Sequence, residues 1–170
     1  MNGKRMALAF ILAMLMCLSG CSAVMLDQEK TELFVSDGME IVLPAQFEKH
    51  NAEGYTVCYA TPTVTVLALR EAFSLAEGLE NMTVREYADL VYLANAVKNP
   101  SPITDAEGFP LMEYTYRVET VGADFVYLSV MYKADDAFWT VQFACPEGNY
   151  EEYRPQFITW AKSVKFVSAE

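Results

Sequence analysis

The chain has 170 residues and a formal net charge of −11, from 23 acidic and 12 basic residues. This surplus of negative charge repels a phosphate backbone, which argues against a nucleic acid as partner. The chain has only 1 histidine, which excludes a histidine-rich metal site by count.

Residues 1–20 have the order of a secretory signal. Two basic residues and no acid precede an unbroken apolar run over residues 6–18, which is shorter than the roughly 20 residues that a membrane-spanning helix needs. The closing segment Leu18-Ser19-Gly20-Cys21 resembles the bacterial lipobox, which implies that Cys21 carries a diacylglycerol and that the chain is cut just before it. The alternatives are an ordinary secreted protein cut near Gly20 and a retained N-terminal anchor.

These features divide the chain into a lipoprotein signal peptide at 1–20, a tether at 21–30 and a single α+β domain at 31–170. We expect the mature protein on the extracytoplasmic face of the cell membrane or envelope. An acidic domain repels anionic lipid head groups, so the N-terminal lipid should hold it at the membrane. Residues 22–30 span at most ~30 Å when extended, so the domain stays close to that membrane.

Cys58 and Cys145 are the cysteines left for the domain. In an oxidising compartment they can form a disulfide. They could instead provide a reactive thiol or serve as two small buried side chains. Two cysteines without a nearby histidine do not make a structural zinc site, and we expect no metal and no cofactor.

The first half of the domain is predicted to be mostly strands. The pattern favours strands at 32–36, 39–43, 54–60 and 64–73, with an Asp37-Gly38 turn between the first two and a loop at 74–82. Pro44 ends the second strand, and Phe47 follows in a short connector that should place its ring in the core.

A helix follows this loop. Thr83 and Glu86 match a capping box, and Asn99-Pro100 stops the helix. The residues expected on its buried face are Val84, Tyr87, Ala88, Val91 and Ala94, and that face is widened by Leu90, Leu93 and Val97.

The second half shows the clearest sheet. Residues of two kinds alternate over 111–119 and 137–145, the run 125–133 lies between them, and the short turns that separate the three runs predict an antiparallel meander. A terminal helix then runs to about Lys162, with Pro155 expected in its first turn, where a missing amide donor costs least. Residues 164–167 could form a closing strand.

The order of these elements resembles the PsbP-like α/β/α sandwich, found in an extrinsic photosystem subunit and in small bacterial lipoproteins. The resemblance covers about residues 31–168 and implies an α+β fold, an antiparallel sheet meander flanked by helices on both faces. It also implies a binding or assembly role with no shared catalytic residues. The matching positions are Met39–Pro44, Phe47, Thr83–Val91, Ala137–Phe143, Phe157, Trp160 and Ser163–Phe166.

Few residues suggest chemistry. His50 lies in a polar stretch and should be exposed, out of hydrogen-bond reach of Cys58, Cys145 and any serine hydroxyl. A set of tyrosines could form an exposed platform for a glycan or a partner, or could pack on the sheet with their hydroxyls at the rim. These are Tyr92, Tyr114, Tyr116, Tyr127 and Tyr132.

We therefore expect no enzyme. The first hypothesis is a non-catalytic interaction or assembly module that docks onto an envelope or membrane protein. The alternative is a protein that binds a small ligand or an envelope glycan in a cleft beside the sheet.

Overall fold

The structure is a computed structural model that describes residues 30–106 and 108–167. The predicted signal peptide, Cys21 and nearly all of the tether lie outside these residues. The structure therefore describes most of the predicted domain.

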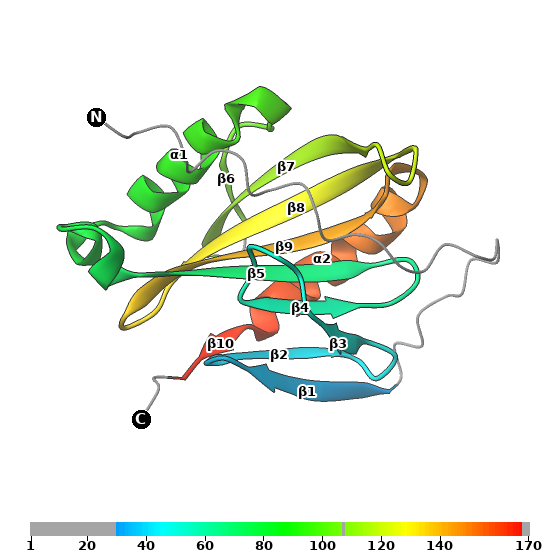
Figure 1. Cartoon of the computed structure of the whole chain (residues 1–170), viewed down its shortest axis with the longest axis horizontal. Coiled ribbons are helices and arrows are strands. Elements are labelled where there is room, and N and C mark those ends of the chain that lie inside the picture. Colours follow the sequence, from blue (N-terminus) through cyan, green and yellow to red (C-terminus); the bar gives the residue numbers. More distant parts are fainter. Residues whose placement is uncertain (1–29, 107, 168–170) are drawn as a thin grey trace.

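The main sheet has seven strands, and every neighbouring pair in it is antiparallel. Its three longest strands follow one another in the chain and confirm the predicted meander (Figure 1). In spatial order the strands are β3 (Glu48–His50), β4 (Val57–Ala60), β5 (Thr65–Ala72), β9 (Ala137–Pro146), β8 (Ala123–Lys133), β7 (Phe109–Val118) and β6 (Thr104–Ala106).

A second sheet has three strands in the order β1, β2, β10. These are β1 (Thr31–Ser36), β2 (Met39–Pro44) and β10 (Lys165–Phe166). The Asp37-Gly38 turn joins β1 and β2 with φ angles of 53° and 87°, the left-handed geometry that a two-residue hairpin requires. A Cβ at Gly38 would also lie 3.2 Å from the Val167 carbonyl oxygen, so glycine is needed there for two reasons.

Two α-helices lie on opposite faces of the main sheet, which confirms the predicted fold class. Helix α1 (Val84–Ala94) contacts β7 and β8, whereas α2 (Tyr150–Ser163) contacts β2, β8 and β9 and lies behind the sheet in Figure 1. Four short 3-10 helices fill the connections: η1 (Phe73–Leu75), η2 (Leu79–Asn81), η3 (Ala96–Lys98) and η4 (Glu147–Asn149).

The two faces of the sheet support two cores. The larger joins the sheet to α2 and to the small sheet, where Trp139 and Phe143 meet Phe157 and Trp160. The smaller lies under α1, where the rings of Tyr87 and Phe138 stack with centroids 4.3 Å apart. Because both faces are covered, β9 is buried along nearly its whole length and not only on alternate residues.

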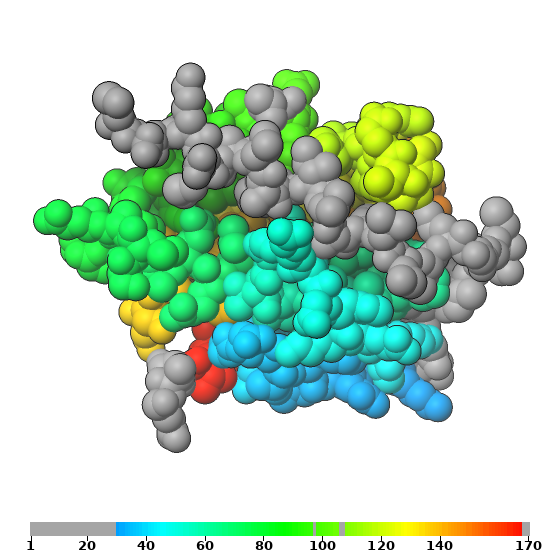
Figure 2. Space-filling view, viewed as in Figure 1, coloured from blue at the N-terminus to red at the C-terminus, as the bar shows by residue number. Residues whose placement is uncertain are grey.

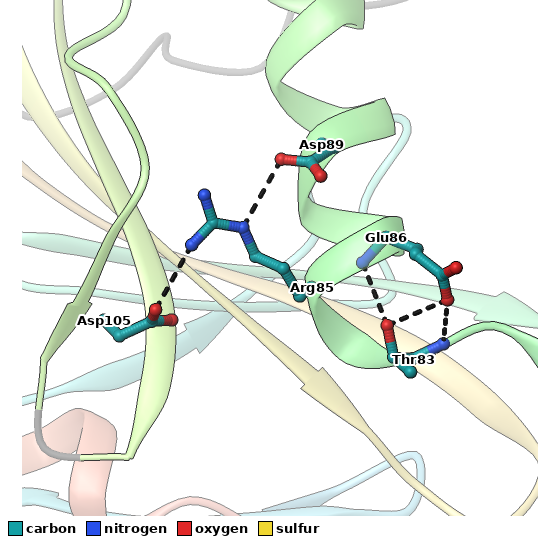
Figure 3. A network of polar contacts seen from close by, with 5 residues as sticks. All are labelled: Thr83, Arg85, Glu86, Asp89 and Asp105. Atoms are coloured by element: carbon teal, nitrogen blue, oxygen red, sulfur yellow. Dashed lines mark hydrogen bonds and ion pairs between the residues drawn. The ribbon is translucent and has the colours of Figure 1, made fainter.

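The predicted capping box of α1 is confirmed. The Thr83 hydroxyl accepts a hydrogen bond from the Glu86 amide at 3.2 Å, and the Thr83 amide donates to the Glu86 carboxylate at 2.8 Å (Figure 3). These contacts satisfy amide donors that the first turn of a helix leaves without partners.

Three expectations are corrected. Pro155 lies in the second turn of α2, because the helix already starts at Tyr150, directly after η4. Leu90, Leu93 and Ala94 are exposed, since α1 buries only a narrow stripe around Tyr87 and Ala88. The short strands β3 and β6 lie in segments for which the sequence pattern predicted no strand.

Candidate functional site

The face of the main sheet that carries α1 also holds a buried polar network around Gln142. The Gln142 side chain is only 5% exposed. Its amide nitrogen donates to the Tyr114 hydroxyl at 3.0 Å and to the Ser129 hydroxyl at 3.1 Å, and its amide oxygen accepts from the Tyr55 hydroxyl at 3.2 Å. The amide therefore has partners on both of its polar atoms.

Strand register explains why these residues meet. Gln142 on β9 lies opposite Ser129 on β8, and Ser129 in turn lies opposite Met112 on β7. Side chains alternate between the two faces along a strand, so Tyr114, two residues after Met112, points to the same face. Tyr55 reaches the network from the segment just before β4.

Four tyrosines surround this network, and we call them the tyrosine cluster: Tyr55, Tyr114, Tyr116 and Tyr127. The rings of Tyr114 and Tyr127 stack with centroids 5.0 Å apart and an interplanar angle of 5°. The Lys98 ammonium lies 4.7 Å from the centre of the Tyr114 ring and 5.7 Å from that of Tyr116, within the range of a cation–π contact. Burial lowers the pKa of Lys98, because the charged ammonium is partly removed from water.

The tyrosine cluster can donate hydrogen bonds and stack, but the hydroxyls of Tyr55, Tyr114 and Tyr127 do not ionise near neutral pH, because burial raises their pKa values. Burial, helped by the neighbouring Tyr116, raises the pKa of Tyr127 to about 12. Burial also raises the pKa values of Tyr55 and Tyr114, with smaller contributions from neighbouring tyrosines. Such groups suit the binding and orientation of a partner better than proton abstraction.

The structure divides the tyrosines that the sequence singled out. Tyr114, Tyr116 and Tyr127 gather in one cluster, where Tyr114 is buried and the other two are half-buried. Tyr92 packs against the core under α1. Tyr132 points to the opposite face of the sheet and donates to the Ala161 carbonyl at 2.9 Å. Of the two alternatives for these tyrosines, packing on the sheet fits the structure better than a fully exposed platform.

Sequence reasoning missed Tyr55, Lys98 and Gln142 as members of this site. The only signal for Gln142 was an amide within an otherwise apolar and aromatic strand. Tyr55 and Lys98 come from segments that flank regular elements, so their meeting depends on the fold and not on any local pattern.

Cys58 and Cys145 are free and buried in this structure, so the disulfide that the sequence left open as one of three alternatives is not formed. Cys58 lies opposite Leu67 on β5, and Leu67 lies opposite Gln142, so Cys58 belongs to the face that carries α1. Cys145 is three residues from Gln142 and points to the other face. The sheet itself separates the two sulfur atoms.

Neither thiol is set up as a nucleophile. Burial raises the pKa of Cys58 to about 11 and that of Cys145 to about 12. A thiol with such a pKa is protonated near neutral pH, and the thiolate is the reactive form. Of the three alternatives for these cysteines, small buried side chains fit the structure.

His50 is exposed, as expected, but it lies in β3 and not in a loop. It occupies the position directly opposite Cys58 in the pairing of β3 with β4. Within the described part of the chain, His50 makes no hydrogen bond to a cysteine or serine side chain. His50 and Cys58 are therefore paired in register but share no hydrogen bond in the described part of the chain.

In residues 30–106 and 108–167, no group of three or more His, Cys, Asp or Glu side chains could hold a metal ion. No helix in the same ranges is long and apolar enough to span a membrane. The proposed lipid-bearing Cys21 lies outside them.

The outer face of α1 presents apolar side chains to solvent. Leu90 is 50% exposed and Leu93 is 66% exposed. Arg85 on the same helix contacts Asp89 on the next turn at 3.5 Å and Asp105 on β6 at 3.2 Å (Figure 3). The contact with Asp105 ties the helix to the edge of the sheet. The leucines are therefore displayed on an anchored helix.

Comparison with known proteins gives structural similarity only. No family model and no curated protein sequence matches the chain. The solution structure of cyanobacterial PsbP (CyanoP) from Synechocystis sp. PCC 6803 matches with a TM-score of 0.52 and 14% identity, over 88% of this chain and 99% of that chain. A crystal structure from Bacteroides thetaiotaomicron matches with a TM-score of 0.53 and 12% identity, over 82% of this chain and 49% of that one.

The chain thus spans about half the length of the Bacteroides protein. At these identities the likeness concerns the fold and carries no residue roles. With the sheet order and the helix on each face, it shows that the chain has the PsbP-like α+β fold.

Proposed function

We propose that this protein is a lipid-anchored extracytoplasmic lipoprotein that acts as a non-catalytic interaction or assembly module. The lipid on Cys21 holds it at the membrane, and its folded domain docks onto an envelope or membrane protein. The lipobox-like segment supports the anchor, and a PsbP-like fold is consistent with a binding module.

The observation that carries the docking role is the exposed apolar stripe on α1. Leu90, Leu93 and the exposed Ala94 follow the i, i+3, i+4 spacing with which a helix fills an apolar groove on a partner. A neighbouring side of the same helix packs on the sheet through Tyr87 and Ala88. The helix can therefore offer its outer face without unfolding.

A photocrosslinking experiment tests the docking role. We expect a photoreactive residue at position 93, in the full-length lipoprotein in its native membrane, to capture an envelope or membrane protein. The same residue at Glu151, which is exposed on α2, is the matched control and should not capture it. Replacing Leu90 by Ser should lower the capture at position 93. Equal capture at both positions, or none at either, would contradict docking through α1.

The anchor has its own test. Cys21→Ala should release the protein from the membrane fraction or mislocalise it, because no acyl chain can then be attached. Mass spectrometry of the wild-type N-terminus should show the lipid on Cys21. A normally processed Cys21→Ala protein that still partitions with membranes would contradict lipid anchoring at this residue.

The tyrosine cluster supports a second candidate, the binding of a small ligand or an envelope glycan. Tyr116 and Tyr127 are half-buried, and Lys98 lies over the rings of Tyr114 and Tyr116, so aromatic faces and a cation occur together. Sugar rings stack on such faces. Calorimetric titration with soluble cell-wall glycan fragments should then show binding that Tyr116→Ala weakens and Tyr92→Ala does not. No heat of binding would remove this candidate.

A further inference from the structure

The outward face of the small sheet gathers a second set of exposed aliphatic side chains. The exposed fractions are 57% for Leu33, 60% for Val35, 36% for Val42 and 52% for Val167. Leu33 and Val42 lie directly opposite each other in the pairing of β1 with β2. The amide of Val167 donates to the Gly38 carbonyl at 2.9 Å, which holds Val167 at the same sheet. We call these four residues the aliphatic face.

Alternation along the strands separates this face from the core. Met39, Ile41 and Leu43 point inward and are fully buried, and Phe34 packs edge-on against Tyr59 with centroids 5.0 Å apart. The aliphatic face is therefore the second side of a sheet whose first side already meets the core. In the described part of the chain, no element covers its four side chains.

The position of the aliphatic face in the chain suggests what covers it. Strand β1 begins at Thr31, directly after the proposed tether, and residues 22–30 reach at most ~30 Å from Cys21. If Cys21 carries lipid, as proposed above, the small sheet is the part of the domain tied most closely to the bilayer. The placement of the small sheet near the bilayer rests on the proposed lipid anchor.

We infer that the aliphatic face rests on the lipid bilayer, with its side chains at the boundary between head groups and acyl chains. Charge on this part of the sheet is balanced, because Glu40 and Lys165 lie directly opposite each other. Contact is therefore apolar and does not depend on anionic head groups. Four small side chains bind a membrane weakly on their own, but a short tether supplies an effective concentration on the order of millimolar.

This contact would orient the domain. Figure 2 shows β1 and β2 of the small sheet, in blue, along one margin of the molecule, and Figure 1 shows α1 at the opposite margin of the same view. With the small sheet on the bilayer, α1 points away from the lipid. Leu90 and Leu93 are then presented to a partner and do not compete for the membrane.

Fluorescence quenching in vesicles tests the inference. The full lipidated chain carries one added surface cysteine, Val35→Cys, and is labelled with an environment-sensitive dye. Cys58 and Cys145 are buried, so the dye should react with the added thiol. Leu93→Cys is the matched control, because it also replaces an exposed aliphatic residue. Val167→Cys is a second reporter on the aliphatic face, in case labelling at Val35 disturbs β1.

We expect nitroxides attached to lipid chains to quench the dye at 35 and 167 several-fold more than the dye at 93, and a water-soluble quencher to show the reverse order. In phosphatidylcholine vesicles this order should be the same at low and high salt, since apolar contacts are little screened. In vesicles that also contain phosphatidylglycerol the order should hold at high salt, where the repulsion between the acidic domain and the anionic head groups is screened.

Several results would overturn the inference. Vesicle-bound protein with equal aqueous quenching at 35 and 93 would mean that the anchor works but the face does not dock. A dye at 35 shielded from both quenchers would indicate a second copy or another protein on the face. Quenching at 35 that vanishes at high salt would assign the contact to charged groups. Protein that does not bind vesicles at all would contradict the lipid anchor as well.

Discussion

At the scale of single residues, Gln142 is the side chain whose removal should be felt most. Gln142→Leu keeps a similar volume but leaves the hydroxyls of Tyr55, Tyr114 and Ser129 without their shared partner. Removing a hydrogen-bond partner from buried polar groups lowers folding stability by about 1–3 kcal/mol. Urea denaturation should therefore show a free energy of unfolding lower by about that amount.

Gln46→Leu is the control for this experiment, because Gln46 is exposed in the turn before β3. Its effect should stay within about 0.5 kcal/mol, as for most surface changes. Equal losses in the two variants would mean that the Gln142 network contributes nothing specific to stability.

The Gln142 network also shows which contacts could not be predicted from the sequence. The alternating pattern of residues 137–145 places Gln142 on one face of a strand, and the structure agrees. Its partners depend on the register of β8 and β7 and on Tyr55 arriving before β4. Register is set by packing over the whole sheet, so no local pattern could name these partners.

At the scale of elements, the capping box of α1 gives the sharpest prediction. Thr83→Ala removes the hydroxyl that accepts from the Glu86 amide. Loss of such a cap usually costs about 1 kcal/mol, so the thermal midpoint should fall. Thr120→Ala, in the turn after β7, removes an exposed threonine outside any helix and should change the midpoint little. An unchanged midpoint for Thr83→Ala would mean that the helix start is stabilised in another way.

Elements with strong periodicity were predicted well, and weak ones were not. The runs at 111–119, 125–133 and 137–145 became β7, β8 and β9, because each is long and is bounded by turn residues. Strands β3 and β6 are too short and polar to show any period. The pattern also assigned Leu90 and Leu93 to the core, since helical spacing alone does not reveal how wide a stripe the neighbours of a helix cover.

At the scale of the whole molecule, most of the sequence signal describes packing. The residues behind the PsbP-like resemblance, among them Phe47, Trp139, Phe157 and Trp160, are core positions of the larger cluster. Such positions specify a fold that many proteins can share. The two surfaces for which contacts are proposed, the outer face of α1 and the aliphatic face, are exposed because no described element packs on them. That property appears only after folding.

The same burial predicts how stability depends on pH. The pKa values of Cys58 and Cys145 rise from near 9 to about 11 and 12, and that of Tyr127 rises from 10.0 to about 12. Above pH 9 the folded chain therefore holds protons that the unfolded chain has lost. A state that binds more protons is disfavoured as the pH rises, so stability is complete below about pH 9 and declines between about pH 9 and 12.

Urea denaturation at pH 7, 9, 10 and 11 should thus show a free energy of unfolding that is constant at first and then falls. The double variant Cys58→Ala, Cys145→Ala separates the two kinds of group. Its decline should begin about one pH unit later, near the ordinary phenol pKa of about 10, because only the tyrosines then lose protons on unfolding. A wild-type free energy of unfolding that is equal at pH 7 and pH 11 would mean that these thiols and hydroxyls are in contact with water in the folded protein.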